Sequence, residues 1–166
     1  MPSSIYAAIP LMALLAVMQT AVLARFPMLG VVPLLPFLVA LLWGLLNGIE
    51  EGAVWAFTAG FFLDLFSISP LGLLALSMMT AVIAATWIQE ALPTSRVLLP
   101  PLLIILATVI QYLGYLLLLR LWGNSNSLQA LVNLTNIIVL HLLLSPPIYG
   151  LFYWITRLMR PRTVQV

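Results

Sequence analysis

The chain has 166 residues, of which 64% are apolar and only 6% are charged, with six arginines, four acidic residues, no lysine and no cysteine. A soluble domain usually carries about 25% charged residues, so this composition excludes a soluble globular enzyme, a disordered segment and a nucleic-acid-binding domain. The lack of cysteine excludes disulfides, thiolate nucleophiles and sulfur-ligated metals. We therefore expect an all-α, polytopic membrane protein with residues 1–166 in a single transmembrane domain.

The uncharged stretches in the first half of the chain predict three helices, since a span needs roughly 20 apolar residues. The first is predicted at Ile5–Ala24, and it is not read as a secretory signal peptide because it lacks a basic start and its apolar run is too long. Prolines delay the second helix to about Pro36–Gly48, and Glu50-Glu51 is expected to close the turn after it. A third, short helix is predicted at Gly52–Phe66.

The turn before the fourth helix is predicted at Ser67–Pro70. Serine is a favoured N-cap and proline is favoured at the first helical position, so Ser69 is expected to cap the helix and Pro70 to begin it. The fourth helix should end near Glu90.

The last two predicted helices flank the polar run Gly123–Ser127. The fifth opens with Pro100-Pro101 and ends at Arg120. The sixth covers Leu131–Leu158, and Pro146-Pro147 should kink it, because each ring removes a backbone donor and crowds the preceding turn.

We therefore predict a bundle of six transmembrane helices with cytoplasmic N- and C-termini. This orientation places Arg96 and the arginines near the C-terminus inside and only Arg25 and Arg120 outside, as the positive-inside rule requires. The alternative is five spans, with residues 31–66 forming a re-entrant or interfacial hairpin and the N-terminus outside.

Few residues could carry chemistry. No set has the spacing of a catalytic or metal site, so we expect no enzyme activity, no catalytic residue, no metal and no cofactor. The one histidine, His141, falls in the sixth span. It is either a proton relay or ligand contact, as intramembrane ionisable groups often are, or a neutral imidazole that hydrogen-bonds between helices. We prefer the second interpretation.

Small residues repeat every four positions on the first two spans and indicate close helix packing. At this spacing, helix backbones can approach each other in lipid. Internal packing is the simpler interpretation, and a stripe facing lipid would instead bind a partner helix. The candidate helix-packing or partner faces are Ala16, Thr20 and Ala24 on the first span, and Gly44 and Gly48 leading to Gly52 on the second.

Asp64 is the most informative single residue, because the free-energy cost of an ionised aspartate in a span must be offset by a partner. The free amides at the start of the next helix, from Ser69 to Gly72, are the expected partners, since that end of a helix carries a partial positive charge. Asp64 would then close the turn between the third and fourth helices. In a functional alternative it faces a partner or an outward cavity.

Around Asp64 the sequence reads Glu51-Gly52, then AGFFLDLFS over 59–67 and PLGLLAL over 70–76. This stretch resembles the central signature of the MreD family of bacterial rod shape-determining proteins. In that family a glycine-rich helix leads to a G-x-x-x-D step, and a glycine opens the next helix after a short turn. Gly60, Asp64 and Gly72 match those positions, and Gly52 matches the earlier glycine.

The resemblance implies a non-enzymatic scaffold of the cell-wall elongation complex, required for rod shape, that crosses the bacterial cytoplasmic (inner) membrane several times. Its implied partners are MreC and, through MreC, the actin-like MreB, the SEDS-type glycosyltransferase and a class B penicillin-binding transpeptidase. Membrane lipid surrounds it, and no nucleic acid is involved.

The MreD family is also thought to resemble the substrate-binding components of energy-coupling-factor vitamin transporters. Those six-helix proteins dock through small residues on the first helix, for which Ala16, Thr20 and Ala24 could serve, although Thr20 departs from alanine. The alternative function is therefore a small-molecule (vitamin) carrier. It predicts that polar residues converge on an outward cavity, with Gln19, Asp64, Gln111 and His141 as the candidates.

Overall fold

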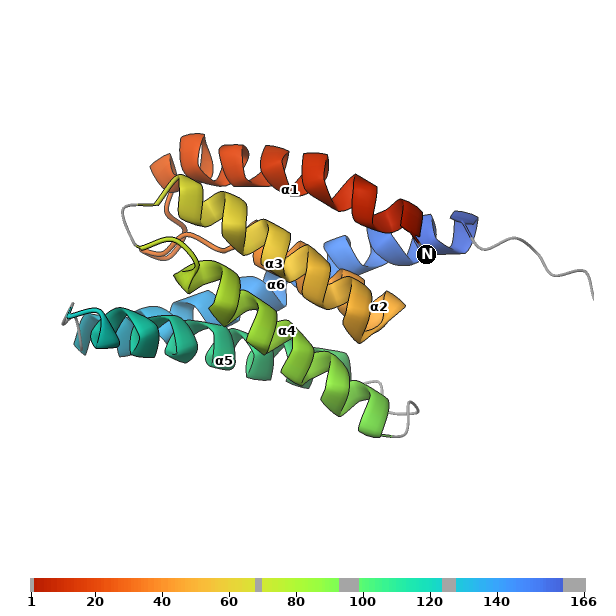
Figure 1. Cartoon of the computed structure of the whole chain (residues 1–166). Coiled ribbons are helices and arrows are strands. Elements are labelled where there is room, and N and C mark those ends of the chain that lie inside the picture. Colours follow the sequence, from red (N-terminus) through yellow and green to blue (C-terminus); the bar gives the residue numbers. More distant parts are fainter. Residues whose placement is uncertain (1, 68–69, 93–98, 124–127, 160–166) are drawn as a thin grey trace, which may run out of the picture.

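The computed structural model describes residues 2–67, 70–92, 99–123 and 128–159, and every regular element in these ranges is a helix (Figure 1). In chain order the elements are α1 (Pro2–Ala21), the 3-10 helix η1 (Leu23–Arg25), α2 (Leu35–Asn47), α3 (Ile49–Leu65), α4 (Leu73–Ala91), α5 (Leu99–Leu121) and α6 (Leu128–Met159).

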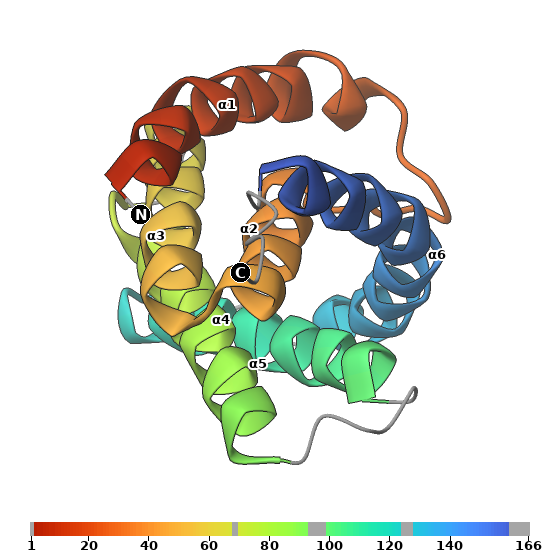
Figure 2. The same ribbon diagram turned by 90° about the vertical axis from the view of Figure 1, so that its right-hand side faces the viewer.

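Helix α2 lies at the centre of the bundle, and the other helices surround it (Figure 2). Its residues Pro36–Leu45 are all buried, which follows from a sequence that is apolar on every face. Consecutive helices run in alternating directions, so chain ends and connections gather at the two ends of the bundle (Figure 1).

The prediction that Glu50-Glu51 lies in a turn is wrong. Helix α3 begins at Ile49, so both glutamates are in its first turn. The physical reason is Gly48, whose φ of 101° lets the chain reverse at one residue. Acidic side chains are also favourable at this position, because they face the positive end of the helix dipole.

The prediction that Pro70 begins the fourth helix is also wrong. Helix α4 begins at Leu73 and its N-cap is Gly72, at a φ of 97°. Ser69, predicted as the cap, lies outside the described residues. A glycine in the left-handed region sets the start of α4 three residues later than the proline rule indicates.

The last two helices follow the prediction closely. Pro100 and Pro101 lie in the first turn of α5. Helix α6 begins three residues before the predicted Leu131 and continues through Pro146 and Pro147, and its ribbon changes direction along its length (Figure 2).

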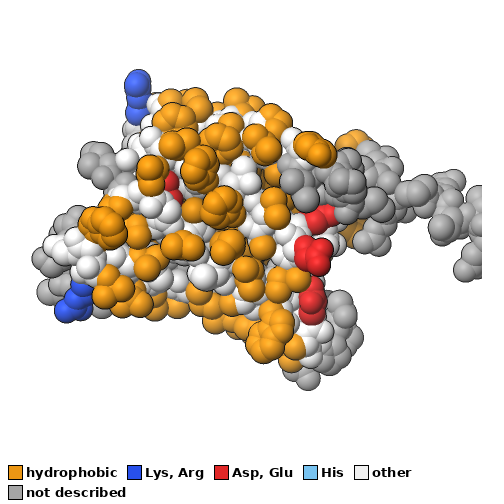
Figure 3. All heavy atoms as spheres, viewed as in Figure 1, with side chains coloured by type: hydrophobic (Ala, Val, Ile, Leu, Met, Phe, Trp, Pro, Cys, Tyr) orange, Lys and Arg blue, Asp and Glu red, His pale blue; other side chains and the backbone are white. Residues whose placement is uncertain are grey.

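Four helices in the described part of the chain are long and apolar enough to cross a membrane: α1 with η1, α4, α5 and α6. The other two are shorter, with 13 residues in α2 and 17 in α3. The sides of the bundle carry many exposed apolar side chains (Figure 3).

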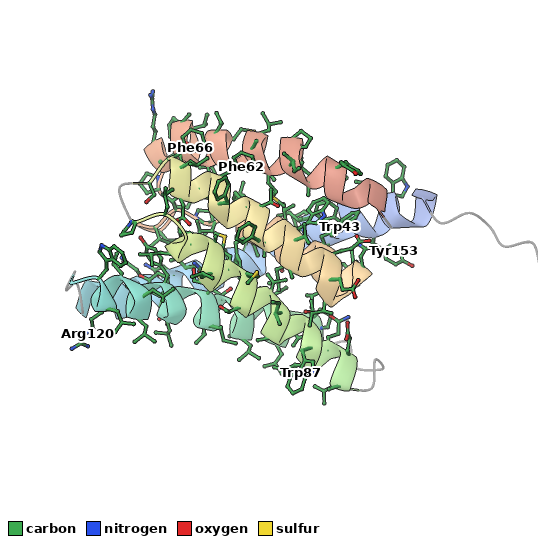
Figure 4. The ribbon with its side chains drawn as sticks, in the orientation of Figure 1. Trp43, Phe62, Phe66, Trp87, Arg120 and Tyr153 are labelled. Atoms are coloured by element: carbon green, nitrogen blue, oxygen red, sulfur yellow. The ribbon has the colours of Figure 1, made fainter. Side chains whose placement is uncertain are left out.

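The charged side chains that the structure describes lie toward the ends of the bundle. Acidic side chains gather where α2 and α4 finish, and arginines lie at the opposite end (Figure 3). Figure 4 shows Arg120 at that end and Trp87 toward the other. Charges at both ends with an apolar belt between them are typical of a protein that crosses a bilayer.

Candidate functional site

Asp64 lies at the end of α3 and binds the first turn of α4. Its side chain is only 1% exposed. Oδ2 accepts hydrogen bonds from the amides of Gly72 at 2.9 Å and Ala75 at 3.1 Å, and Oδ1 accepts one from Leu74 at 3.1 Å. The carboxylate therefore satisfies amides that a helix N-terminus leaves without intrahelical partners.

Gly60 lies one helical turn before Asp64 and touches the same part of α4. A Cβ at Gly60 would lie 2.6 Å from the amide nitrogen of Ala75 and 2.8 Å from the carbonyl carbon of Leu74. Real Cβ atoms essentially never come this close to backbone. Glycine at position 60 is what lets the first turn of α4 come within reach of the Asp64 carboxylate.

Gly60, Asp64 and Gly72 therefore act together as one structural element. Gly60 provides the close approach, Asp64 binds the amides, and Gly72 takes the positive φ that begins α4. The G-x-x-x-D step and the following glycine thus have a physical explanation: they join α3 to α4.

Gly44 and Gly52 face each other across the contact between α2 and α3. A Cβ at Gly52 would lie 2.7 Å from the Cα of Gly44, and one at Gly44 would lie 2.9 Å from the Cα of Gly52. Val82 of α4 lies against both glycines, at 3.0 Å and 3.2 Å from these Cβ positions. The two glycines thus bring three helices together at one point.

The remaining small residues are distributed differently from the predicted stripes. Gly48 forms the junction between α2 and α3. Ala16 is fully buried, Thr20 is partly buried and binds the carbonyl of Ala16, and Ala24 is exposed and lies in η1 beyond the end of α1. Ala16, Thr20 and Ala24 therefore do not form one continuous outward face, because the helix ends before Ala24.

His141 is fully buried and links α6 to α5 and to the start of α2. Its Nε2 accepts the Leu34 amide at 3.2 Å, and its Nδ1 lies 3.0 Å from Oγ1 of Thr108. The Thr108 hydroxyl donates to the carbonyl of Ile104 at 2.7 Å. Nε2 must therefore be unprotonated and Nδ1 must carry the proton, which identifies a neutral imidazole with both nitrogens bonded.

Gln19 binds the same backbone segment from α1. Its Nε2 donates to the Pro33 carbonyl at 2.8 Å, and its Oε1 accepts the Leu35 amide at 3.2 Å. A side-chain amide can both donate and accept a hydrogen bond, as a backbone peptide group does. Gln19 therefore bonds this segment as a neighbouring peptide group would. Sequence reasoning did not predict that Gln19 and His141 meet the same segment.

The four candidates for a carrier site do not share one set of partners. Asp64 binds α4, whereas Gln19 and His141 bind the segment before α2. Gln111 of α5 is 1% exposed, and its Oε1 has no hydrogen-bond partner among the described residues. Within the same residues, no group of three or more His, Asp or Glu could hold a metal ion.

Sequence reasoning also missed an aromatic cluster near the C-terminal end of α2. The rings of Trp43 and Trp55 stack at 4.5 Å, and Phe152 of α6 packs edge-on against Trp43. The Trp43 indole donates to Oε2 of Glu51 at 2.9 Å. Figure 4 places Trp43 and Tyr153 in the same region. The signal available was the spacing of Trp43, Glu51 and Trp55 on either side of Gly48.

Comparison with known families matches residues 3–155 to the family described as rod shape-determining protein MreD. No curated protein matches the chain, and no solved structure matches it.

Proposed function

The chain belongs to the MreD family of rod shape-determining membrane proteins, and we propose that it acts in rod shape as a non-enzymatic scaffold that binds MreC. Through MreC it would be linked to MreB, the SEDS-type glycosyltransferase and a class B penicillin-binding transpeptidase. The membrane is proposed to be the bacterial cytoplasmic (inner) membrane.

One observation carries this proposal beyond the family. The buried polar side chains of Gln19, Asp64 and His141 each bond to backbone atoms of their own chain. These hydrogen bonds hold helices and connections together, which favours a structural role over catalysis or carriage of a vitamin. The exposed apolar sides of the bundle suit contacts with lipid and with partner helices.

We further propose that all six helices cross the membrane and that both termini are cytoplasmic. The alternating helix directions support an even number of crossings (Figure 1). Arg25 and Arg120 would then lie outside, and Arg96 and the C-terminal arginines inside. A reporter enzyme fused at residue 3 tests this topology: activity on the cytoplasmic side supports six spans, and external activity supports the five-span alternative.

Affinity purification from native membranes tests the scaffold. The proposal predicts that MreC co-purifies with the tagged chain and that no vitamin does. Gly60→Leu, which cannot fit against Ala75, controls for loss of fold, and Gly150→Leu, where a Cβ meets nothing within 4 Å, controls for substitution of a helix glycine. A folded chain that retains a vitamin but no MreC would contradict the proposal.

A further inference from the structure

The connection from Phe26 to Leu34 has an unusual composition for a chain segment between two helices. It reads FPMLGVVPL, without a polar or charged side chain. Connections that face water are normally polar. Here Phe26 is 70% exposed, Met28 52% and Leu29 62%. The connection therefore presents large apolar side chains at the very end of the bundle.

Part of the backbone of this connection is bonded within the protein. Met28 and Val31 exchange two hydrogen bonds, at 2.8 and 3.0 Å, across a tight turn in which Leu29 and Gly30 both have positive φ. Leu29 is the only non-glycine residue with positive φ among the described residues. Two hydrogen bonds of its own backbone therefore close this turn.

Three side chains from α1 and α6 bind this connection and the first residue of α2. Gln19 bonds the Pro33 carbonyl and the Leu35 amide, His141 accepts the Leu34 amide, and Asn136 donates to the Leu29 carbonyl at 2.9 Å. Irregular backbone at membrane depth is tolerated only where protein satisfies its polar groups. Hydrogen bonds from three polar side chains to this segment are what irregular backbone at membrane depth requires.

Charged residues at this end of the bundle complement lipid phosphate. Arg25 is exposed and directly precedes Phe26, and Arg120 is exposed and directly precedes Leu121 and Trp122, which are 77% and 71% exposed. Neither arginine has an ion-pair partner in the part of the chain that the structure describes. Arginine beside aromatic and aliphatic side chains is typical of the boundary between lipid headgroups and acyl chains.

We propose that the Phe26–Leu34 connection inserts into the membrane as an interfacial anchor. It lies at the boundary between headgroups and acyl chains, while Arg25 binds the phosphate of a phospholipid. The short length of α2 agrees with this. Its 13 residues extend about 20 Å, less than the roughly 30 Å of the hydrocarbon core. An immersed connection fills the remaining depth. The anchor rests on membrane insertion alone, so failure of MreC binding would leave it unaffected.

The lack of native cysteine makes the test direct. Single cysteines Leu29→Cys, Leu143→Cys and Glu90→Cys are spin-labelled in the full chain and reconstituted in vesicles of phosphatidylethanolamine and phosphatidylglycerol. Leu143, 71% exposed on α6, is the lipid-facing control, and the exposed Glu90 is the water-facing control. The label at Leu29 should favour oxygen over a water-soluble nickel chelate, at a depth between the two controls. Chelate access equal to that at Glu90 would overturn the proposal.

A second variant tests the arginine. Arg25→Gln should shift the depth of the Leu29 label severalfold more than that of the Leu143 label, whose unchanged spectrum reports an intact fold. No shift at Leu29 would overturn the phosphate contact. If the Leu29 label is open to oxygen in vesicles but shielded from both reagents in native membranes, another protein covers the turn. The proposal of an interfacial anchor is then wrong.

Discussion

Gly60 on α3 and Ala75 on α4 touch through their backbones, with no room for a side-chain carbon between them. The contact holds the amides of α4 where Asp64 can bind them. Gly60, Asp64 and Gly72, which in sequence are only two glycines and an aspartate, thereby form a joint between two helices.

Gly60→Ala should destabilise the protein by about 1–3 kcal/mol, because the added methyl group overlaps backbone that cannot rotate away. The free energy of unfolding in detergent, measured by SDS titration, checks this. The matched control is Gly150→Ala on α6, where a Cβ meets nothing within 4 Å. That substitution should stabilise the helix by about 0.5–1 kcal/mol. Equal effects of the two substitutions would contradict the joint.

Asp64→Asn should lower stability by about 1.5–3 kcal/mol, because an uncharged amide replaces a carboxylate that accepts three N–H groups and its NH₂ cannot accept any of them. Thermal unfolding followed by tryptophan fluorescence measures the loss. Glu90→Gln, which neutralises an exposed acid, should change the midpoint little. If Asp64→Asn unfolds at the wild-type midpoint but abolishes rod shape, Asp64 acts on a partner instead.

His141 and Thr108 should be energetically coupled. His141→Phe leaves the Leu34 amide and the Thr108 hydroxyl without their partner and should cost about 1–3 kcal/mol, and Thr108→Val removes the acceptor of the ring N–H. In a double-mutant cycle the two losses should not add, since they break the same hydrogen bond. Additive losses would show that the two side chains act independently.

The stability losses caused by alanine at Gly44 and at Gly52 should also be non-additive. Alanine at either position overlaps the Cα of the other, so each single variant should lose about 1–3 kcal/mol. The double variant should lose less than the sum if one shift of α2 against α3 accommodates both methyl groups. Gly114→Ala, whose Cβ would lie 3.7 Å from Ser77, is the control and should be tolerated. Strict additivity would argue against one shared contact.

Much of the fold could be predicted from the length of uncharged runs and from proline. The start of α5 at Leu99 followed from Pro100-Pro101. The prediction that Asp64 joins the third and fourth helices agrees with its hydrogen bonds, but the amides involved are those of Gly72, Leu74 and Ala75. They differ from the expected set because Gly72 has a positive φ and α4 begins only after it. The preference of proline for the first helical position does not predict this later start.

The contacts between distant segments could not be predicted. The four-residue spacing of Gly44, Gly48 and Gly52 indicates a stripe that runs from the second helix into its turn, but Gly48 reverses the chain, so that Gly44 and Gly52 face each other across two helices. Gln19 and His141 are 122 positions apart in the sequence and meet only because α1 and α6 flank the same connection. Periodicity reports which face of a helix is small or polar, but not what that face meets.

We propose above that this chain binds MreC without catalysing a reaction. The most direct measurement is the mass of the assembly formed when purified chain and purified MreC are reconstituted together in lipid nanodiscs. A complex of defined stoichiometry that contains both proteins is expected. Two separate populations, each holding one protein, with the chain still folded by tryptophan fluorescence, would contradict it.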